Sequence, residues 1–214
     1  DTNRSLHEWV GDKDREQARH HLGSIIVKVL ELGWLTSNKT NSKTNSKTDS
    51  KTETRPPEDI LPHVEGIEED QENLGELSYF QGFHDIASTV MLTTNSEDLS
   101  VNILYNLARG ALAPWFEETL APTMDVINKI FGVVKKVDPE LSSFFEQSAV
   151  TSDFALSWVL TWFSHNIRDL AALQRIFDYL IARQNIDEVM LLSVAYICTC
   201  RGQLLSIKCD RDYI

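Results

Sequence analysis

Apolar residues recur at helical spacing along most of this chain, and this pattern limits its possible folds more than any other feature. Apolar side chains three and four positions apart form one stripe along a helix, whereas a half-buried strand alternates apolar and polar residues. The sequence has no alternating segment of useful length and no hairpin signal. We therefore predict an all-α protein of seven to nine helices, with helical segments at residues 14–35, 77–92, 100–109, 123–137, 139–147, 153–167, 169–183 and 187–200.

Aspartate, proline and glycine mark the expected helix boundaries. A carboxylate at the start of a helix can accept hydrogen bonds from the unpaired N–H groups of the first turn. Three aspartates are expected at such N-cap or first-turn positions: Asp153, Asp169 and Asp187. Breaks are expected just before Pro122 and Pro139, because proline disfavours a helical conformation in the residue before it. Gly33 is expected to end the first helix.

A low-complexity tract interrupts the helical pattern after the first helix. Three copies of a four-residue unit, Asn/Asp-Ser-Lys-Thr, occupy residues 41–52, and residues 36–59 contain no apolar residue apart from two adjacent prolines. Such a tract cannot offset the entropy lost on ordering by burying apolar surface. We predict a disordered insertion at 36–59 within a single domain spanning 1–214. An alternative is that its lysines contact acidic surfaces.

Charge and cysteine content exclude several classes of function. The 32 acidic residues outnumber the 20 basic ones and give a net charge of −12. Binding to nucleic acid or anionic lipid is therefore disfavoured, because both are polyanions. The three cysteines all lie after residue 197, which is no disulfide framework and indicates a reducing, cytosolic compartment.

The sequence also predicts no membrane-spanning segment in this chain. No secretory signal opens it, and the longest nearly unbroken apolar stretch, residues 189–198, is too short to cross a bilayer. The chain begins at an aspartate without an initiator methionine. We expect it to be a fragment of a longer protein.

Familiar catalytic and ligand-binding motifs are incomplete or absent in this sequence. His7 and Glu8 begin like a zinc-protease helix, but Gly11 stands where the second histidine ligand would be. There is no GxxxxGK[ST] phosphate-binding loop and no GxSxG nucleophile motif. We therefore expect no metal site, no cofactor and no nucleotide site belonging to this chain.

Two short segments carry more information. One is Asp1-Thr-Asn-Arg4, and the other is Tyr79-Phe-Gln81-Gly82 at the start of a predicted helix. Each is weak alone, because a terminal arginine is usually solvated and a glutamine among aromatic residues usually caps a backbone group.

Together they resemble the TBC (Tre-2/Bub2/Cdc16) domain of Rab GTPase-activating proteins. The family has a D-x-x-R motif, matched by Asp1 and Arg4, followed by a Y-x-Q-G motif, matched by Tyr79, Gln81 and Gly82. Two later family blocks match residues 157–164 and 175–180, in the family's order. Four segments resemble a subgroup of the family that is anchored in the endoplasmic reticulum: residues 79–86, 122–125, 138–141 and 154–158. That subgroup acts on Rab proteins of the early secretory route and ends in a hydrophobic tail.

The resemblance implies a role for each matched residue. Arg4 would stabilise charge on the γ-phosphate of a bound G protein, and Gln81 would orient the attacking water. Gly82 would allow close backbone approach, Asp1 would orient Arg4, and Tyr79 would fix the loop. Four aromatic residues are interpreted as core, namely Trp158, Trp162, Phe163 and Phe177. Asp178 is expected to cap or bridge helices.

The resemblance also implies the partner and the location. The partner would be a GTP-bound Rab, which would bring its own GTP and Mg²⁺, and the site would lie on the cytosolic face of the endoplasmic reticulum or early secretory membranes. Two alternatives stay open. One is a helical scaffold that binds a Rab without catalysis. The other is a helical-repeat adaptor, which the absence of a fixed 30- to 50-residue period in the sequence disfavours.

Overall fold

The computed structural model describes residues 6, 10–11, 14–43 and 77–207, with side chains left out at 38–43. Across these residues the backbone forms nine α-helices and two 3₁₀ helices and contains no strand, which confirms the all-α prediction. The elements in chain order are α1 (Arg15–Lys43), α2 (Phe83–Thr94), α3 (Glu97–Arg109), η1 (Ala113–Phe116), α4 (Ala121–Val137), α5 (Pro139–Gln147), η2 (Ser152–Ala155), α6 (Leu156–Leu160), α7 (Leu170–Arg183), α8 (Asp187–Thr199) and α9 (Arg201–Ser206).

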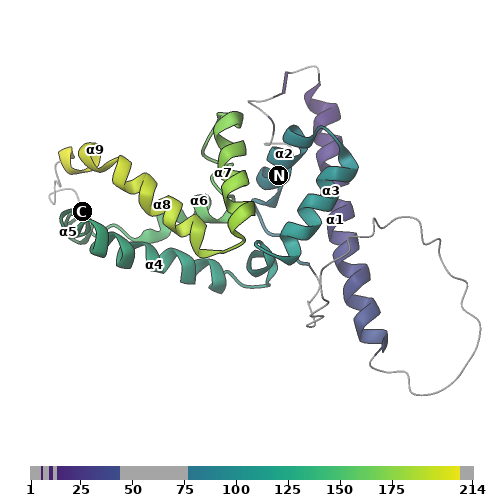
Figure 1. Ribbon diagram of the computed structural model, residues 1–214, viewed down its shortest axis with the longest axis horizontal. Helices are drawn as coiled ribbons and strands as arrows, with labels where there is room; N and C mark the ends of the chain where they lie inside the picture. The colour runs from purple at the N-terminus through teal and green to yellow at the C-terminus, as the bar shows by residue number, and fades with distance from the viewer. Residues whose placement is uncertain (1–5, 7–9, 12–13, 44–76, 208–214) are drawn as a thin grey trace, which may run out of the picture.

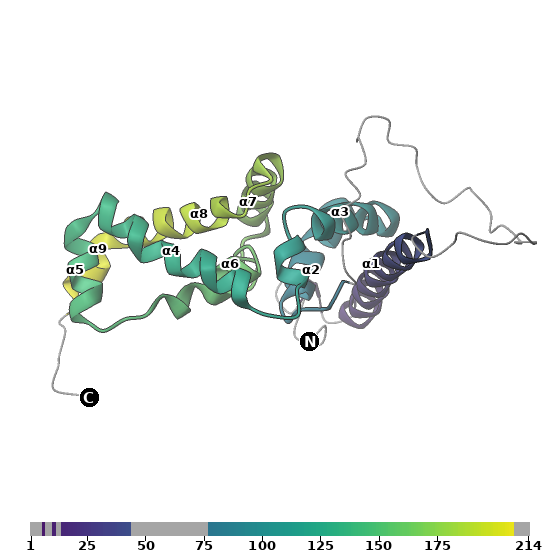
Figure 2. The same ribbon diagram turned by 90° about the horizontal axis from the view of Figure 1, so that it is seen from below.

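The helices form an elongated body with a three-helix group at one end. Helices α1, α2 and α3 pack against one another there, while α4, α5, α8 and α9 form the other end (Figures 1 and 2). Helices α6 and α7 lie between the two groups, and α7 contacts α2. Among the described helices, none is both long and apolar enough to cross a bilayer.

Helix α2 is buried on most of its surface because it lies among α1, α3 and α7. Its first residue, Phe83, is fully buried and packs against two other aromatic rings. The centroid of Phe83 lies 5.7 Å from that of Phe80 and 4.9 Å from that of Phe116. This aromatic cluster fixes the position of the turn that precedes α2.

The three aspartates expected at helix starts illustrate the boundary signals. Asp169 caps α7, accepting from the backbone N–H groups of Ala171 at 2.9 Å and Ala172 at 3.3 Å. Asp187 lies in the first turn of α8. Asp153 lies in the first turn of the 3₁₀ helix η2, so the prediction that each aspartate occupies an N-cap or first-turn position is confirmed.

Helix α1 is longer than predicted. It runs to Lys43 instead of ending near Gly33, so residues 36–43 of the expected disordered tract are helical and that boundary was wrong. Gly33 is not a helix end: a Cβ there would lie 2.5 Å from Leu77 Cδ1, so glycine provides room for packing. Extending an existing helix costs much less than starting one, and the Thr36 hydroxyl donates to the carbonyl of Leu32. Residues 44–59 lie outside the described part of the chain.

The predicted helix 153–167 does not exist as one element. It is divided into η2 and α6, and α6 ends at Leu160. Trp162 and Phe163 then adopt left-handed backbone angles, with φ of 50° and 66°, while both side chains are buried. The apolar spacing that predicted a helix here comes instead from two aromatic rings buried in a tight turn. The predicted helix at 77–92 likewise starts only at Phe83, and α9 was not predicted.

A buried carboxylate joins α7 to α8. Glu188 is only 5% exposed, accepts a hydrogen bond from the Tyr179 hydroxyl at 2.5 Å, and accepts another from Arg183 Nε at 3.0 Å. The Tyr179 hydrogen bond is the main cause that lowers the pKa of Glu188, and Arg183 adds to it. A lowered folded-state pKa stabilises the fold above the unfolded value, and this contribution is lost as pH falls through the folded-state pKa.

We predict that Glu188→Gln lowers the Tm at neutral pH and weakens the acid dependence of stability below about pH 4.3, the ordinary glutamate pKa. Thermal unfolding across acid pH would measure both effects. Glu146→Gln is the matched control, because Glu146 pairs with Lys135 on the exposed surface and such pairs contribute little. Equal pH profiles for the two variants would contradict the role given to Glu188.

Candidate functional site

The turn that carries Gln81 lies immediately before α2. Phe80 on one side and Phe83 on the other are buried in the aromatic cluster, whereas Gln81 is exposed. The Gln81 side chain makes no hydrogen bond to another described residue. The backbone N–H of Phe83 donates to the carbonyl of Phe80 at 3.2 Å, which closes the turn. An exposed amide on an anchored turn is free to contact a partner.

Gly82 has a conformation and surroundings that exclude larger residues. Its φ is 117°, which L side chains rarely adopt, and a Cβ would lie 2.9 Å from Thr161 Cγ2. The need for glycine therefore arises from packing within this chain. Close approach of a partner's backbone at Gly82 stays a prediction.

We predict that Gly82→Ala destabilises the protein by about 1–3 kcal/mol, because alanine must accept a strained backbone and displace Thr161. Urea unfolding would measure the loss. Gly132→Ala is a suitable control. Gly132 lies within α4, and among the described residues no atom outside its own helix backbone and chain neighbours lies within 4 Å of the position that a Cβ would take. Alanine in a helix interior should stabilise by about 0.5–1 kcal/mol. A Gly82→Ala variant as stable as the unsubstituted chain would contradict the steric account.

Tyr79 ties the turn to α2 through a buried histidine. The Tyr79 hydroxyl lies 2.9 Å from His84 Nδ1. Burial lowers the pKa of His84 despite the opposing charge of Asp85, and burial raises the pKa of Tyr79. The lowered pKa keeps His84 neutral near pH 7, and Nδ1 of the neutral ring can accept a hydrogen bond from the tyrosine hydroxyl. The contact between Tyr79 and His84 was not predicted from the sequence.

Asp85 extends these contacts to a distant segment. Its Oδ2 lies 3.1 Å from His165 Nδ1, and its Oδ1 lies 3.5 Å from His84 Nε2. His165 belongs to the tight turn after α6, where its backbone N–H donates to the Thr161 hydroxyl at 3.3 Å. The turn before α2 and the turn after α6 therefore meet beside Gln81.

The sequence-predicted site residues are only partly described. Tyr79, Gln81 and Gly82 occupy one turn, while Asp1 and Arg4 lie outside the described residues. Leu6, two positions after Arg4, is 2% exposed and belongs to the hydrophobic core.

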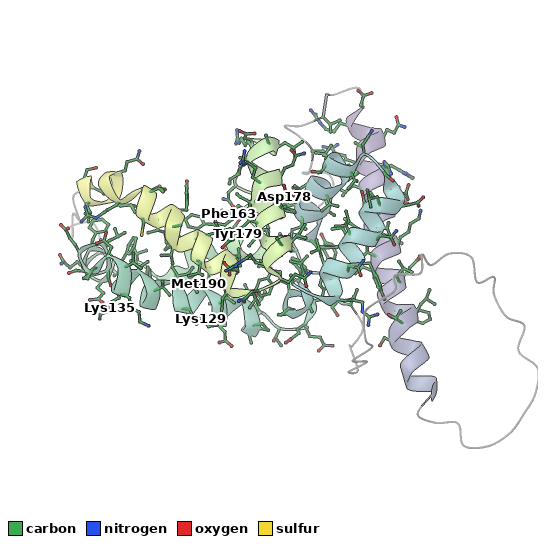
Figure 3. All side chains as sticks on the ribbon, in the orientation of Figure 1. Lys129, Lys135, Phe163, Asp178, Tyr179 and Met190 are labelled. Atoms are coloured by element: carbon green, nitrogen blue, oxygen red, sulfur yellow. The ribbon has the colours of Figure 1, made fainter. Side chains whose placement is uncertain are left out.

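The four aromatic residues interpreted as core are packed as predicted. Trp162, Phe163 and Phe177 are buried, and half-buried Trp158 stacks on Phe163 with ring centroids 5.8 Å apart. Figure 3 places Phe163 in the middle of the molecule near α7. Asp178 does not behave as expected: it lies inside α7, exposed, with no ion pair to another described residue, so it caps and bridges no helix there. Within the described ranges, no three His, Cys, Asp or Glu side chains are arranged to hold a metal.

Comparison with known proteins agrees with this arrangement. The sequence model of the Rab-GTPase-TBC domain matches residues 71–205, a range that includes the Gln81 turn. The chain is 29% identical over 135 residues to TBC1 domain family member 20 of Homo sapiens, covering 63% of this chain and 33% of that protein.

A fungal protein is similar over nearly the same length. The GTPase-activating protein gyp10 of Schizosaccharomyces pombe is 32% identical over 126 residues, covering 58% of this chain and 31% of that protein. The chain thus matches about a third of the length of each relative. Because the family's sequence model covers more than half of the chain, and the all-helical fold agrees with it, this chain belongs to the Rab-GTPase-TBC domain family.

Proposed function

We propose that this chain is a GTPase-activating protein for a Rab-family small GTPase, and that it supplies Arg4 and Gln81 in trans to the bound GTP. The observation that carries the proposal is the position of Gln81. It stands exposed on a turn whose neighbours Phe80 and Phe83 are buried, within a domain of the RabGAP family.

The chemistry of GTP hydrolysis suits a glutamine at this place. Phosphoryl transfer needs a positioned water and stabilisation of charge on the transferred group, with little covalent participation by protein. A glutamine amide has both an acceptor oxygen and donor N–H groups, so it can orient a water toward phosphorus. A rigid turn limits the entropy lost when that geometry forms.

Arg4 supplies what glutamine lacks. Its guanidinium stays charged at any physiological pH and donates through a planar fork that matches phosphate oxygens. Arginine fingers accelerate GTP hydrolysis by about 10³ to 10⁵. The burial of Leu6 supports the proposal, because this core residue comes only two positions after Arg4 in the sequence.

In this proposal the nucleotide and Mg²⁺ belong to the Rab, and the chain needs no cofactor of its own. The reaction is accelerated by the chain but occurs in the partner's nucleotide site. The consequence would be termination of a Rab signal in vesicle trafficking on the cytosolic side of early secretory membranes.

Binding to a transition-state analogue would separate this function from a scaffold that only holds a Rab. Catalytic side chains contact the transition state more strongly than the ground state, and analogues bind about 10² times or more tighter than substrates. We expect tighter binding to Rab·GDP with aluminium fluoride than to Rab with a non-hydrolysable GTP analogue. Arg4→Ala should remove that preference. Equal affinity of the unsubstituted chain for both forms would favour the scaffold.

A further inference from the structure

We infer that Asp85 is a positioning residue for Gln81, acting through His84 on one side and His165 on the other. This inference rests on the proposed function. It concerns residues outside the Tyr-x-Gln-Gly motif and assigns them to the geometry of the reaction.

Four side chains, those of Tyr79, His84, Asp85 and His165, lie one after another between the turn that carries Gln81 and the turn after α6. The Tyr79 hydroxyl lies 2.9 Å from His84 Nδ1, and Nε2 of the same ring lies 3.5 Å from Asp85 Oδ1. His165 Nδ1 lies 3.1 Å from the other carboxylate oxygen and can donate to it. An ionised carboxylate can only accept, so it favours a proton on His165 Nδ1, the ring nitrogen that it faces.

Burial makes Asp85 hard to replace. Its side chain is 13% exposed and that of His84 is 9% exposed, whereas His165 is 63% exposed. One carboxylate oxygen lies 3.1 Å from His165 Nδ1 and the other lies 3.5 Å from His84 Nε2, so the negative charge faces both rings. Asparagine in its place would remove the charge and present an N–H₂ group to one of the two rings where an oxygen now lies.

Two contacts, both made by residues that follow Gln81, join this end of α2 to the turn after α6. Gly82 packs against Thr161, and Asp85 bonds to His165, which is 80 residues away in sequence. Asp85 also donates its backbone N–H to the Gly82 carbonyl at 3.0 Å. Loss of the carboxylate should leave the Gln81 turn folded but let it move relative to the turn after α6.

Such movement should reduce turnover more than binding. A displacement of about 1 Å in a catalytic group can cost about 10² in rate. We expect Asp85→Asn to lower kcat by about 10- to 100-fold with KM for GTP-loaded Rab little changed, the pattern of an interaction realised in the transition state.

The test combines kinetics with hydrogen exchange of the backbone amides at residues 79–85. Asp85→Asn should accelerate exchange in this turn and lower kcat. The matched control Asp187→Asn, which removes an exposed pair with Lys129, should do neither. Exchange and kcat both equal to those of the unsubstituted chain would overturn the inference.

A second pair of variants guards against misfolding of Asp85→Asn. Exposed His165→Ala should lower kcat in the same direction, and His165→Asn should restore it, because an asparagine N–H can take the place of Nδ1–H. Failure of His165→Ala to change kcat or exchange would overturn the part given to His165. If the unsubstituted chain activates no Rab, the proposed function fails, while exchange in the turn still decides whether Asp85 holds it.

Discussion

Gln81→Ala is expected to reduce Rab-stimulated GTP hydrolysis by about 10²- to 10³-fold, the usual cost of removing one donor to a developing transition state. The side chain is exposed and makes no hydrogen bond to another described residue, so the fold should not change. Most of the loss should appear in kcat, because an amide that orients water acts in the transition state.

Single-turnover phosphate release at saturating chain would measure this effect. Gln147→Ala is the matched control, since Gln147 is an exposed glutamine on α5 whose one hydrogen bond within the described residues is to Ser143 in the neighbouring turn. The control should retain full activity. A Gln81→Ala variant with an unchanged rate and unchanged Tm would remove Gln81 from the mechanism.

The largest effect on stability is expected from Phe83→Ala, at about 3–5 kcal/mol. Phe83 is fully buried, and its ring contacts those of Phe80 and Phe116 at the junction of the Gln81 turn and α2. Truncation removes apolar contacts and leaves a cavity. For a chain of this size each kcal/mol lowers the Tm by about 2–4 °C.

Differential scanning calorimetry or urea unfolding would measure this loss. Phe154→Ala provides the comparison, because Phe154 is 38% exposed and packs at the edge of a different aromatic group. Its loss should be clearly smaller. If the two substitutions cost the same, the aromatic cluster around Phe83 would not be a principal source of stability.

Local signals in the sequence predicted the helices of the C-terminal part well. For α4, α5, α7 and α8 the expected and observed boundaries agree within two residues, because proline and aspartate signals accompany strong periodicity there. The turn at Trp162 and Phe163 escaped prediction, since two buried rings in left-handed backbone produce the same apolar spacing as a helix. Gly33 was misinterpreted because its packing against Leu77 depends on a contact 44 residues away in sequence.

The candidate site could be predicted only where the family motif carried it. The motif singled out Gln81 and Gly82, which lie on one turn, but the positive φ of Gly82 and its packing against Thr161 were not predicted. The contact between Asp85 and His165 was not predicted, because it joins residues 80 positions apart and neither position carries a distinctive signal.

The most direct test is single-turnover GTP hydrolysis by a panel of GTP-loaded Rab proteins, with and without excess chain. We predict acceleration of at least one Rab, lost in Arg4→Ala and in Gln81→Ala and retained in Gln147→Ala. Failure to accelerate any Rab, or acceleration that survives both substitutions together, would contradict the proposal that these two side chains act on the partner's GTP.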